Sequence, residues 1–354
     1  MLIPGLSGRE GRVRKRIAVE MRDLGLATAT DRLGNLIATA EGDPDRPSVM
    51  LFAHMDQLGF VVRRIEASGL LRLERLGGVP ERALAAQEVL VCVGEGRDAP
   101  AVIANKSHHA TPPEEKYRVV PYSEIVVDAG FASAVEAREA GVDIGSPVVY
   151  APKAIRLAGG RIAGTSVDDR AGCAVVAEAA RLLAPLSGRP TVHFVFSTQE
   201  EFNLRGARVA AERLKPEIAI QIDLMLATDT PEMQARGDLA LGGGPGMSLY
   251  SFHGRGTLNG TLPHPALVSL FERTARDARI PLQRSAQVGI LTDSSYVQHA
   301  HHGVASIDLG FPCRYTHSAL EVCDLSDLES LTSLLIEGIR RIGLGFSLEH
   351  DDYP

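Results

Sequence analysis

The sequence predicts an α/β fold in which a mostly parallel sheet is flanked by helices and carries an inserted β-rich, barrel-like domain. Short apolar runs alternate with helical patterns near both ends of the chain, an order typical of a parallel sheet covered on both faces. Between Gly59 and about Tyr150 this alternation gives way to short strand-like stretches separated by Gly and Pro. The 354 residues suffice for about two domains. We therefore expect a discontinuous larger domain at 1–59 and 151–354 and an inserted domain at 60–150.

The elements of the larger domain follow from the spacing of apolar residues. In the first expected helix, Val13, Ile17, Val19 and Met21 recur at helical spacing while charges fill the opposite face. The expected helices cover residues 10–24, 172–186, 204–214, 265–279 and 325–342. The expected strands cover residues 36–38, 49–53, 191–197, 218–222 and 304–308. Inside the inserted domain one short helix is expected at 132–140.

The composition and net charge of the chain argue against some classes of binding partner. Hydrophobic residues make up 45% of the chain, so a sizeable core can form. The net charge of -7 argues against nucleic acid or an anionic membrane as the main partner. No apolar run approaches the roughly 20 residues of a membrane-spanning helix. The N-terminal residues lack a signal-peptide pattern, and the four cysteines are scattered without a Cys-x-x-Cys, so we expect a cytoplasmic protein with reduced thiols.

Acidic and imidazole side chains follow the expected strands of the larger domain. In an open α/β sheet, ligand sites lie beyond the carboxyl ends of the strands. Five separate segments deliver ionisable groups to that edge, and they carry His54 and Asp56, Asp168 and Asp169, Glu200 and Glu201, Asp223, and His317. Gathered carboxylates repel one another and lose hydration, and a divalent cation relieves both costs. The segments therefore predict a metal site.

The residue types predict two metal ions and a general base. His, Asp and Glu without Cys form the ligand set of zinc or cobalt, with manganese as an alternative, in hydrolytic sites. Five ligands with one bridging carboxylate give each of two ions three protein ligands, a known hydrolytic arrangement. The expected ligands are His54, Asp168, Glu201, Asp223 and His317. Glu200 is left over, beside the metal pair, to take a proton from the water between the ions.

Each segment alone has a simpler interpretation. A pair such as Glu200 and Glu201 is more often a solvated strand end. Asp168 and Asp169 before a helix are more often an N-cap, which the helix dipole favours. The metal-site hypothesis depends on the convergence of these groups at several strand ends.

Three further motifs stay outside the expected site. His108 and His109 are expected in a loop of the inserted domain, near an interface. The HAHHG segment at 299–303 is expected at the surface or at the rim of the active site. The LGGGPG segment at 241–246 lacks the Lys-Ser/Thr of a phosphate loop, and we expect it to let the backbone pass close to another segment.

Eight segments occur in an order that resembles one enzyme family. They read PGLSGRE, DRLGNLIA, AHMDQLGF, SVDDRAG, STQEEFNLRGA, IDLMLATDTPE, LGGGP and RYTHSALE. Together they resemble the tetrahedral (TET-type) and glutamyl aminopeptidase family of co-catalytic metallopeptidases, whose members are also labelled deblocking aminopeptidases or endoglucanases. The resemblance runs from Pro4 to about Glu321.

The resemblance assigns roles to the ligands by position. It implies that Asp168 bridges two divalent ions. His54 and Asp223 would complete the ligands of one ion, and Glu201 and His317 those of the other. The implied fold is an α/β peptidase domain with an inserted β-barrel-like domain.

The resemblance also implies a base, a supporting carboxylate and an assembly. Glu200 would be the general base, and Asp56 would hydrogen-bond the imidazole of His54 and fix its tautomer. Members of the family associate through the insertion, from dimers to hollow tetrahedral dodecamers that admit short, unfolded peptides.

A few positions depart from the family pattern, and they bear on substrate preference because none is an expected ligand. Glu, Gly, Gly-Gly and Pro are usual where this chain has Gln57, Asn203, Ile290–Leu291 and Ala319. We expect a metal-dependent aminopeptidase acting on short peptides with a free N-terminus. The alternative is a deacylase of N-acyl amino acids or peptides using the same metal pair. A metal-free glycoside hydrolase working through two carboxylates and a non-catalytic assembly module are further hypotheses.

Overall fold

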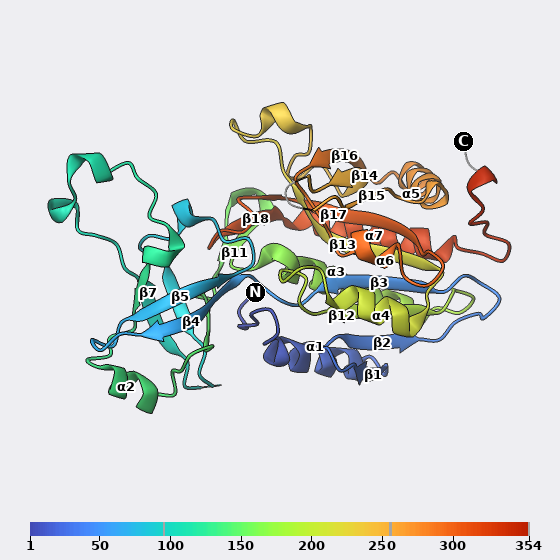
Figure 1. Cartoon of the computed structure of the whole chain (residues 1–354). Coiled ribbons are helices and arrows are strands. Elements are labelled where there is room, and N and C mark those ends of the chain that lie inside the picture. Colours follow the sequence, from blue (N-terminus) through green and yellow to red (C-terminus); the bar gives the residue numbers. More distant parts are fainter. Residues whose placement is uncertain (95, 255–256, 353–354) are drawn as a thin grey trace.

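The chain folds into a large helix-covered sheet with a closed β-barrel beside it (Figure 1). The computed structural model describes residues 1–94, 96–254 and 257–352; residues 95, 255–256 and 353–354 of the expected domains lie outside the described part. The α/β class with a barrel-like β-rich part is thereby confirmed.

The large sheet is parallel at its centre and antiparallel at its margins. Its main path runs β1-β2-β12-β3-β13-β17-β18-β11-β10. The strands are β1 (Ala27–Thr30), β2 (Leu36–Ala40), β3 (Val49–His54), β12 (Val192–Ser197), β13 (Ile218–Leu226), β17 (Ala305–Arg314), β18 (Glu321–Asp324), β11 (Arg161–Gly164) and β10 (Ala154–Arg156). The four neighbours β12, β3, β13 and β17 are mutually parallel. Every residue of β3 is buried, as expected for a strand covered on both faces.

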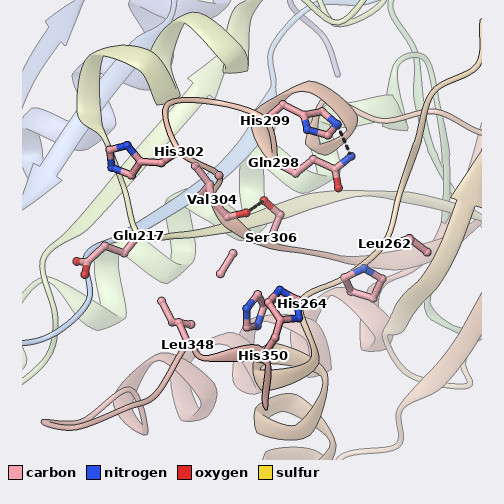
Figure 2. Close-up of a pocket in the computed structure, with 13 residues that line it drawn as sticks. Glu217, Leu262, His264, Gln298, His299, His302, Val304, Ser306, Leu348 and His350 are labelled. Atoms are coloured by element: carbon pink, nitrogen blue, oxygen red, sulfur yellow. Dashed lines mark hydrogen bonds between the residues drawn. The ribbon is translucent and has the colours of Figure 1, made fainter. Parts of the chain in front are cut away.

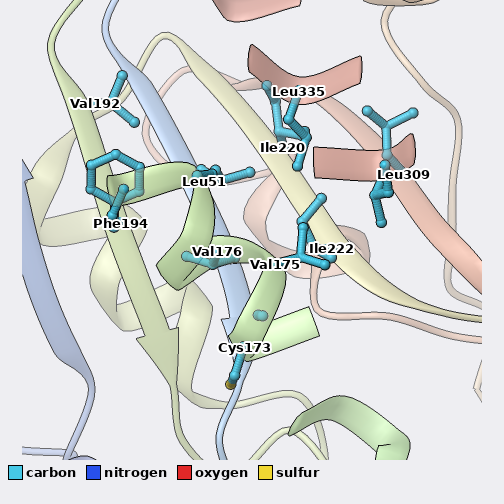
Figure 3. Close-up of a cluster of buried hydrophobic side chains, with 14 of the residues drawn as sticks. Leu51, Cys173, Val175, Val176, Val192, Phe194, Ile220, Ile222, Leu309 and Leu335 are labelled. Carbon is cyan, nitrogen blue, oxygen red and sulfur yellow. The ribbon is translucent and has the colours of Figure 1, made fainter. Parts of the chain in front are cut away.

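Helices cover both faces of these central strands. They are α1 (Gly11–Asp23), α3 (Val167–Leu183), α4 (Gly206–Leu214), α5 (Pro265–Ala278), α6 (Ser294–Val297) and α7 (Leu325–Arg340). Successive residues of β3 alternate between the faces: Leu51 packs in the cluster with α3 and α7, and Phe52 in the cluster with α4 and α6. Figure 3 shows the first cluster, in which Leu51 lies near Phe194 and Val176.

The remaining strands join the large sheet off its main path, and short 3-10 helices lie in both the barrel segment and the rest of the chain. β14 (Gly246–Phe252) pairs with β17, β16 (Gln283–Val288) and β15 (Gly260–Thr261) off the main path. The 3-10 helices are η1 (Glu81–Ala83), η2 (His108–Ala110), η3 (Pro113–Glu115), η4 (Tyr122–Glu124), η5 (Ala158–Gly160), η6 (Gln234–Arg236) and η7 (His350–Asp352). Among the described helices, none combines the length and the apolar character needed to cross a bilayer.

The barrel closes in the order β4-β5-β8-β7-β6-β9 and has a core of its own. Its strands are β4 (Gly59–Ile65), β5 (Leu71–Leu76), β6 (Glu88–Val91), β7 (Ala99–Ile103), β8 (Val126–Asp128) and β9 (Pro147–Tyr150). Helix α2 (Ala134–Glu139) lies within the expected 132–140 and begins at Ser133, whose hydroxyl accepts from the N–H of Glu136. Closure leaves no unpaired sheet edge among the described strands of this domain.

The sheet opens between β3 and β13 at the edge where the site was expected. The β12–β3 pairing continues to Ser197 opposite His54, whereas the β13–β3 pairing ends at Gln221 opposite Phe52. Beyond that point β13 stays with β17 alone, so Asp223 lies on the open side. Such a divergence of neighbouring strands is where open α/β sheets bind ligands.

Three element boundaries differ from the expected ones by four residues or more, all next to this opening. β13 runs on to Leu226 and β17 to Arg314, so Asp223 lies inside a strand and not after it. α3 begins at Val167, and Asp168 and Asp169 lie in its first turn with non-helical backbone angles. Two carboxylates there are compatible with the positive end of the helix dipole.

Candidate active site

His54 and His317 each direct the Nε2 atom of the ring toward the opening between β3 and β13. The Nδ1 atom of His54 lies 3.2 Å from the backbone carbonyl oxygen of Asp56. The Nδ1 atom of His317, in the loop after β17, lies 2.9 Å from the carbonyl oxygen of Gly78. Since a carbonyl only accepts, both Nδ1 atoms carry a hydrogen, and both Nε2 atoms point to another partner.

Asp168 lies between these two nitrogens. Its Oδ1 is 2.9 Å from Nε2 of His54, and its Oδ2 is 3.5 Å from Nε2 of His317. Burial alone would raise the pKa of Asp168, but the contacts with the two imidazoles, His54 foremost, outweigh burial and lower it. A carboxylate with one oxygen toward each imidazole has the geometry needed to bridge two sites.

The described residues contain two groups whose ligand atoms lie within 4.8 Å of one another. One consists of His54, Asp169 and Asp223, and the other of Asp168, Glu201 and His317. The structure thus brings all five sequence-predicted ligands together. It adds Asp169 to the group of His54 and Asp223, while Asp168, 2.9 Å from His54, is grouped with Glu201 and His317.

Asp56 holds the turn that carries the two glutamates. It is fully buried, and its carboxylate accepts the backbone N–H groups of Glu200 and Glu201, each at 3.0 Å. The hydroxyl of Ser7 donates to the same carboxylate, and Nδ1 of His54 lies 3.5 Å from it. Burial would raise the pKa of Asp56, but the bonds from His54 and Ser7 lower it overall, so Asp56 is ionised.

The surrounding carboxylates are destabilised as anions. Burial raises the pKa of Glu201 to about 7 and that of Asp223 to about 8, and nearby Asp168 adds to both. Burial, with Glu201 as a neighbour, also raises the pKa of Glu200 well above its usual value. Oδ2 of Asp169 and Oε1 of Glu201 are buried without a hydrogen-bond partner among the described residues. Orphaned carboxylate oxygens beside imidazole nitrogens fit divalent cations that prefer N and O ligands.

Sequence reasoning missed two supports of this cluster. Glu321, buried at the start of β18, accepts the backbone N–H of Asp168 at 2.9 Å and that of His317 at 2.7 Å. Its position four residues after His317, inside the RYTHSALE segment, was the signal that could have found it. Gly78, in the barrel loop between β5 and η1, gave no sequence signal for its contact with His317.

Two of the departures from the family pattern, Gln57 and Asn203, have local explanations. Oε1 of Gln57 accepts the N–H of Gly5 at 3.0 Å, so it ties the N-terminal segment to the end of β3. Asn203 has a φ of 73°, a left-handed conformation in which Gly is at ease and Asn is tolerated. The carbonyl of Ala319 accepts from the hydroxyl of Thr165, and nothing in the structure explains Leu291.

The HAHHG segment is at the surface but not at the rim of the active site. His299 and His302 line a pocket with Glu217 and Ala305, which lie where β13 and β17 begin (Figure 2). That is the opposite edge of the sheet from Asp223. The pocket lies there because the segment precedes β17 and is not part of the loop that follows it.

The glycine-rich motif passes close to another segment and His108 and His109 lie in a loop, as expected. Their expected place near an interface stays a prediction. The N–H groups of Gly242 and Gly244 donate to the carboxylate of Asp327, at 2.8 and 2.7 Å, so this loop does pass close to the start of α7. His108 and His109 are exposed in η2, a turn in the long loop of the barrel.

Comparison with known proteins identifies the family of the chain. The M42 glutamyl aminopeptidase family matches residues 34–334. SgcX of Escherichia coli K12, an aminopeptidase by name, is 36% identical over 93% of this chain and 88% of its own length. The lysyl aminopeptidase of Pyrococcus furiosus is 32% identical over 94% of this chain and 92% of its own. The Pyrococcus horikoshii TET1 peptidase, which can assemble into a tetrahedron or a large octahedral shell, superposes with a TM-score of 0.84 at 30% identity, over 95% of this chain and 96% of its own. The chain therefore belongs to the M42 glutamyl aminopeptidase family and is, with that family, a peptide-bond hydrolase.

Proposed function

We propose that the chain is a metal-dependent aminopeptidase that removes N-terminal residues from short peptides. The observation that supports this most directly is the pair of ligand groups at the sheet opening, with orphaned oxygens on Asp169 and Glu201. Two divalent ions held by these groups would polarise the scissile carbonyl and lower the pKa of a water molecule. Zinc and cobalt suit this ligand set, and manganese is the alternative.

Different side chains of the site would bind the metal ions and transfer the proton. Asp168 lies between the imidazoles of His54 and His317, and we assign it the bridging role. Oε2 of Glu200 lies 3.9 Å from Nε2 of His54 and belongs to neither ligand group. Glu200 takes a proton from the attacking water and gives it to the leaving amine, and its raised pKa suits that exchange.

The excess of carboxylates favours substrates with a free amine. Six acidic side chains (Asp56, Asp168, Asp169, Glu200, Glu201 and Asp223) surround two imidazoles. Ionised, these six carboxylates exceed the four positive charges of two divalent ions by two, so a positively charged α-amine is attracted to the site, whereas an N-acyl group brings no compensating charge. This supports the aminopeptidase over the deacylase that would use the same residues.

The test is hydrolysis of amino-acid p-nitroanilides and their N-acetyl counterparts by chelator-treated protein, before and after addition of zinc, cobalt or manganese. We expect activity on the free-amine substrates that returns only with metal. Activity confined to the N-acetyl substrates would establish the deacylase. Activity unaffected by the chelator would exclude the metal-dependent mechanism.

We also infer self-association through the barrel, from dimers to a tetrahedral dodecamer, in the cytoplasm. Supporting observations are the assembly of the TET1 peptidase and apolar side chains left uncovered on the barrel, among them Tyr117, which is 97% exposed. The four cysteines are free, which fits a reducing compartment. Light scattering would measure the mass of the oligomer in solution. A mass near that of one 37.9 kDa chain would refute the assembly.

A further inference from the structure

A buried glutamine contacts one of the proposed metal ligands. Gln221 lies where β13 leaves β3, two residues before Asp223 on the same strand. Side chains at this spacing lie on the same face of a strand, so the long amide of Gln221 can reach the shorter carboxylate. Its Nε2 is 3.0 Å from Oδ2 of Asp223, and Gln221 is only 1% exposed.

A second contact fixes which end of the amide faces Asp223. Oε1 of Gln221 accepts the backbone N–H of Ser294, at the start of α6, at 2.6 Å. Because a backbone N–H only donates, the amide oxygen must face Ser294 and the NH₂ group must face Asp223. Metal binding requires an ionised carboxylate, and with an ionised Asp223 this hydrogen bond is charge-assisted.

The segment that holds the amide is itself fixed to neighbouring strands. The hydroxyl of Thr292 donates to Asp308 of β17 at 2.8 Å, and Asp293 accepts from the hydroxyl of Ser197 in β12 at 3.1 Å. All four of these side chains are buried. Together with the contact to β13, segment 292–294 is therefore bound to three central strands. A ligand is placed most precisely when its supporting residues are themselves fixed, and this anchor provides that condition.

Two hydrogen bonds hold the carboxylate of Asp223 in its orientation. Its Oδ1 accepts the N–H of Leu224, the next residue in the chain, at 2.7 Å. Its Oδ2 accepts from Gln221, so this second bond connects the carboxylate to the anchored segment. In this orientation a carboxylate oxygen of Asp223 lies within 4.8 Å of ligand atoms of His54 and Asp169.

We propose that Gln221 is a positioning residue that holds Asp223 toward His54 and Asp169 and thereby strengthens the binding of one of two metal ions. The inference rests on the metal-dependent function proposed above and adds a residue to its site. The amide oxygen alone would satisfy the start of α6, so the NH₂ group on Asp223 is the part that serves the ligand. Among the described residues, no hydrogen bond joins Gln221 to the second ligand group. Its effect should therefore be confined to one ion.

The experiment titrates metal-free protein with cobalt, follows the absorption of bound Co²⁺, and measures affinity by competition with a chelator. Gln221→Met keeps an unbranched side chain of similar length and removes the donor. We expect one of two equivalents to bind about 10- to 100-fold more weakly, with altered absorption bands, and the other to be unchanged.

Gln283→Met is the matched control. The amide of Gln283 also holds backbone groups, because it accepts the N–H of Ala240 at 2.9 Å and donates to the carbonyl of Gly244 at 2.7 Å. Neither contact involves a residue of the two ligand groups. This variant should bind both equivalents of cobalt as the unaltered chain does, even if it is less stable.

The outcomes separate this inference from the proposed function. An unaltered chain that binds no cobalt would overturn both. Two equivalents bound by Gln221→Met as tightly as by the unaltered chain, or an equal weakening of both, would overturn only the role of Gln221. If the variant fails to fold, a crystal structure of the cobalt-loaded unaltered chain decides. The amide nitrogen should lie within hydrogen-bond distance of Asp223, and an amide turned away from a metal-bound Asp223 would overturn the inference.

Discussion

The backbone N–H of Glu200 donates to Oδ1 of Asp56 at 3.0 Å, so the proposed base is held by the carboxylate that also faces the imidazole of His54. Oδ2 of Asp56 holds the N–H of Glu201 in the same way. One buried side chain thus positions the proposed base and two proposed ligands from two neighbouring strands. Since Asp56 is ionised, these are charge-assisted bonds, which are stronger than neutral ones.

Glu200→Gln should abolish most turnover without removing metal. The amide keeps the size of the side chain but cannot take a proton, so kcat should fall at least about 100-fold. The measurements are p-nitroanilide hydrolysis and metal content of the purified protein. Glu201→Gln is the matched variant next to it, and it should lose metal as well as activity. Near-normal turnover in Glu200→Gln would exclude this residue as the base.

Asp56→Asn should destabilise the fold as well as reduce activity. An asparagine offers one acceptor oxygen where Asp56 uses two, and its NH₂ group would face a backbone N–H. A buried donor left without an acceptor costs about 1–3 kcal/mol, which urea unfolding of the metal-free protein can resolve. Ser7→Ala removes one donor to Asp56 and leaves both peptide contacts, so it should cost less. Equal stability of Asp56→Asn and the unaltered protein would contradict this role.

The metal-free protein should lose stability as pH rises from about 5 to 9. Folding raises the pKa of Glu201 to about 7 and that of Asp223 to about 8, chiefly by burial. Their contribution is therefore intact below the unfolded values near 4 and is lost as pH rises through 7 and 8. Against burial, the neighbouring Glu201 and Asp168 raise the pKa of His317 to about 9, and its contribution is also lost as pH rises.

Metal should remove or reverse this trend. Bound cations keep the carboxylates ionised, and metal binding strengthens as the ligands deprotonate. Melting temperatures measured across this pH range, with chelator and with zinc, give the comparison. A chelated protein whose stability increases between pH 6 and 8 would show that these carboxylates are not destabilised as anions.

Gly78→Ala should empty one ligand group and spare the other. A Cβ atom at this position would lie 2.8 Å from Nδ1 of His317, so the imidazole must shift away from residue 78 and lose its present placement relative to Asp168 and Glu201. We expect the metal bound per chain to fall from two to one. Gly11→Ala, where the nearest atom is the flexible end of Arg14 at 3.6 Å, is the control. Two equivalents of metal in Gly78→Ala would contradict the prediction.

The convergence of the candidate site residues was predictable because apolar runs ending in charged residues are rare patterns with a definite geometry. That these residues bind metal stays a prediction. The run at β3 is followed by His54, and the run at β12 is followed by Glu200 and Glu201. Parallel strands end at the same edge of a sheet, so this pattern alone placed both segments together. The family resemblance then assigned them roles. The bulk of the fold followed from the same alternation of strands and helices.

The features that the sequence did not predict depend on local backbone angles or on contacts between segments distant in the chain. The grouping of Asp169 with Asp223 follows from the backbone angles at the start of α3, which spacing does not encode. The antiparallel margins, such as β11 against β18, are short and weakly patterned. The carbonyl of Gly78 acts through its backbone, so its residue type says nothing about its partner.

The carbonyl of Gly78 also restricts which other barrels could replace this one. The barrel is continuous in sequence, closed on itself and built around its own core, which makes it look like a module that recombination can exchange. Yet the acceptor for His317 belongs to the barrel, and the imidazole belongs to the sheet domain. A replacement barrel must therefore return a backbone oxygen to the same place, and a shortened chain without the barrel would leave His317 without this acceptor.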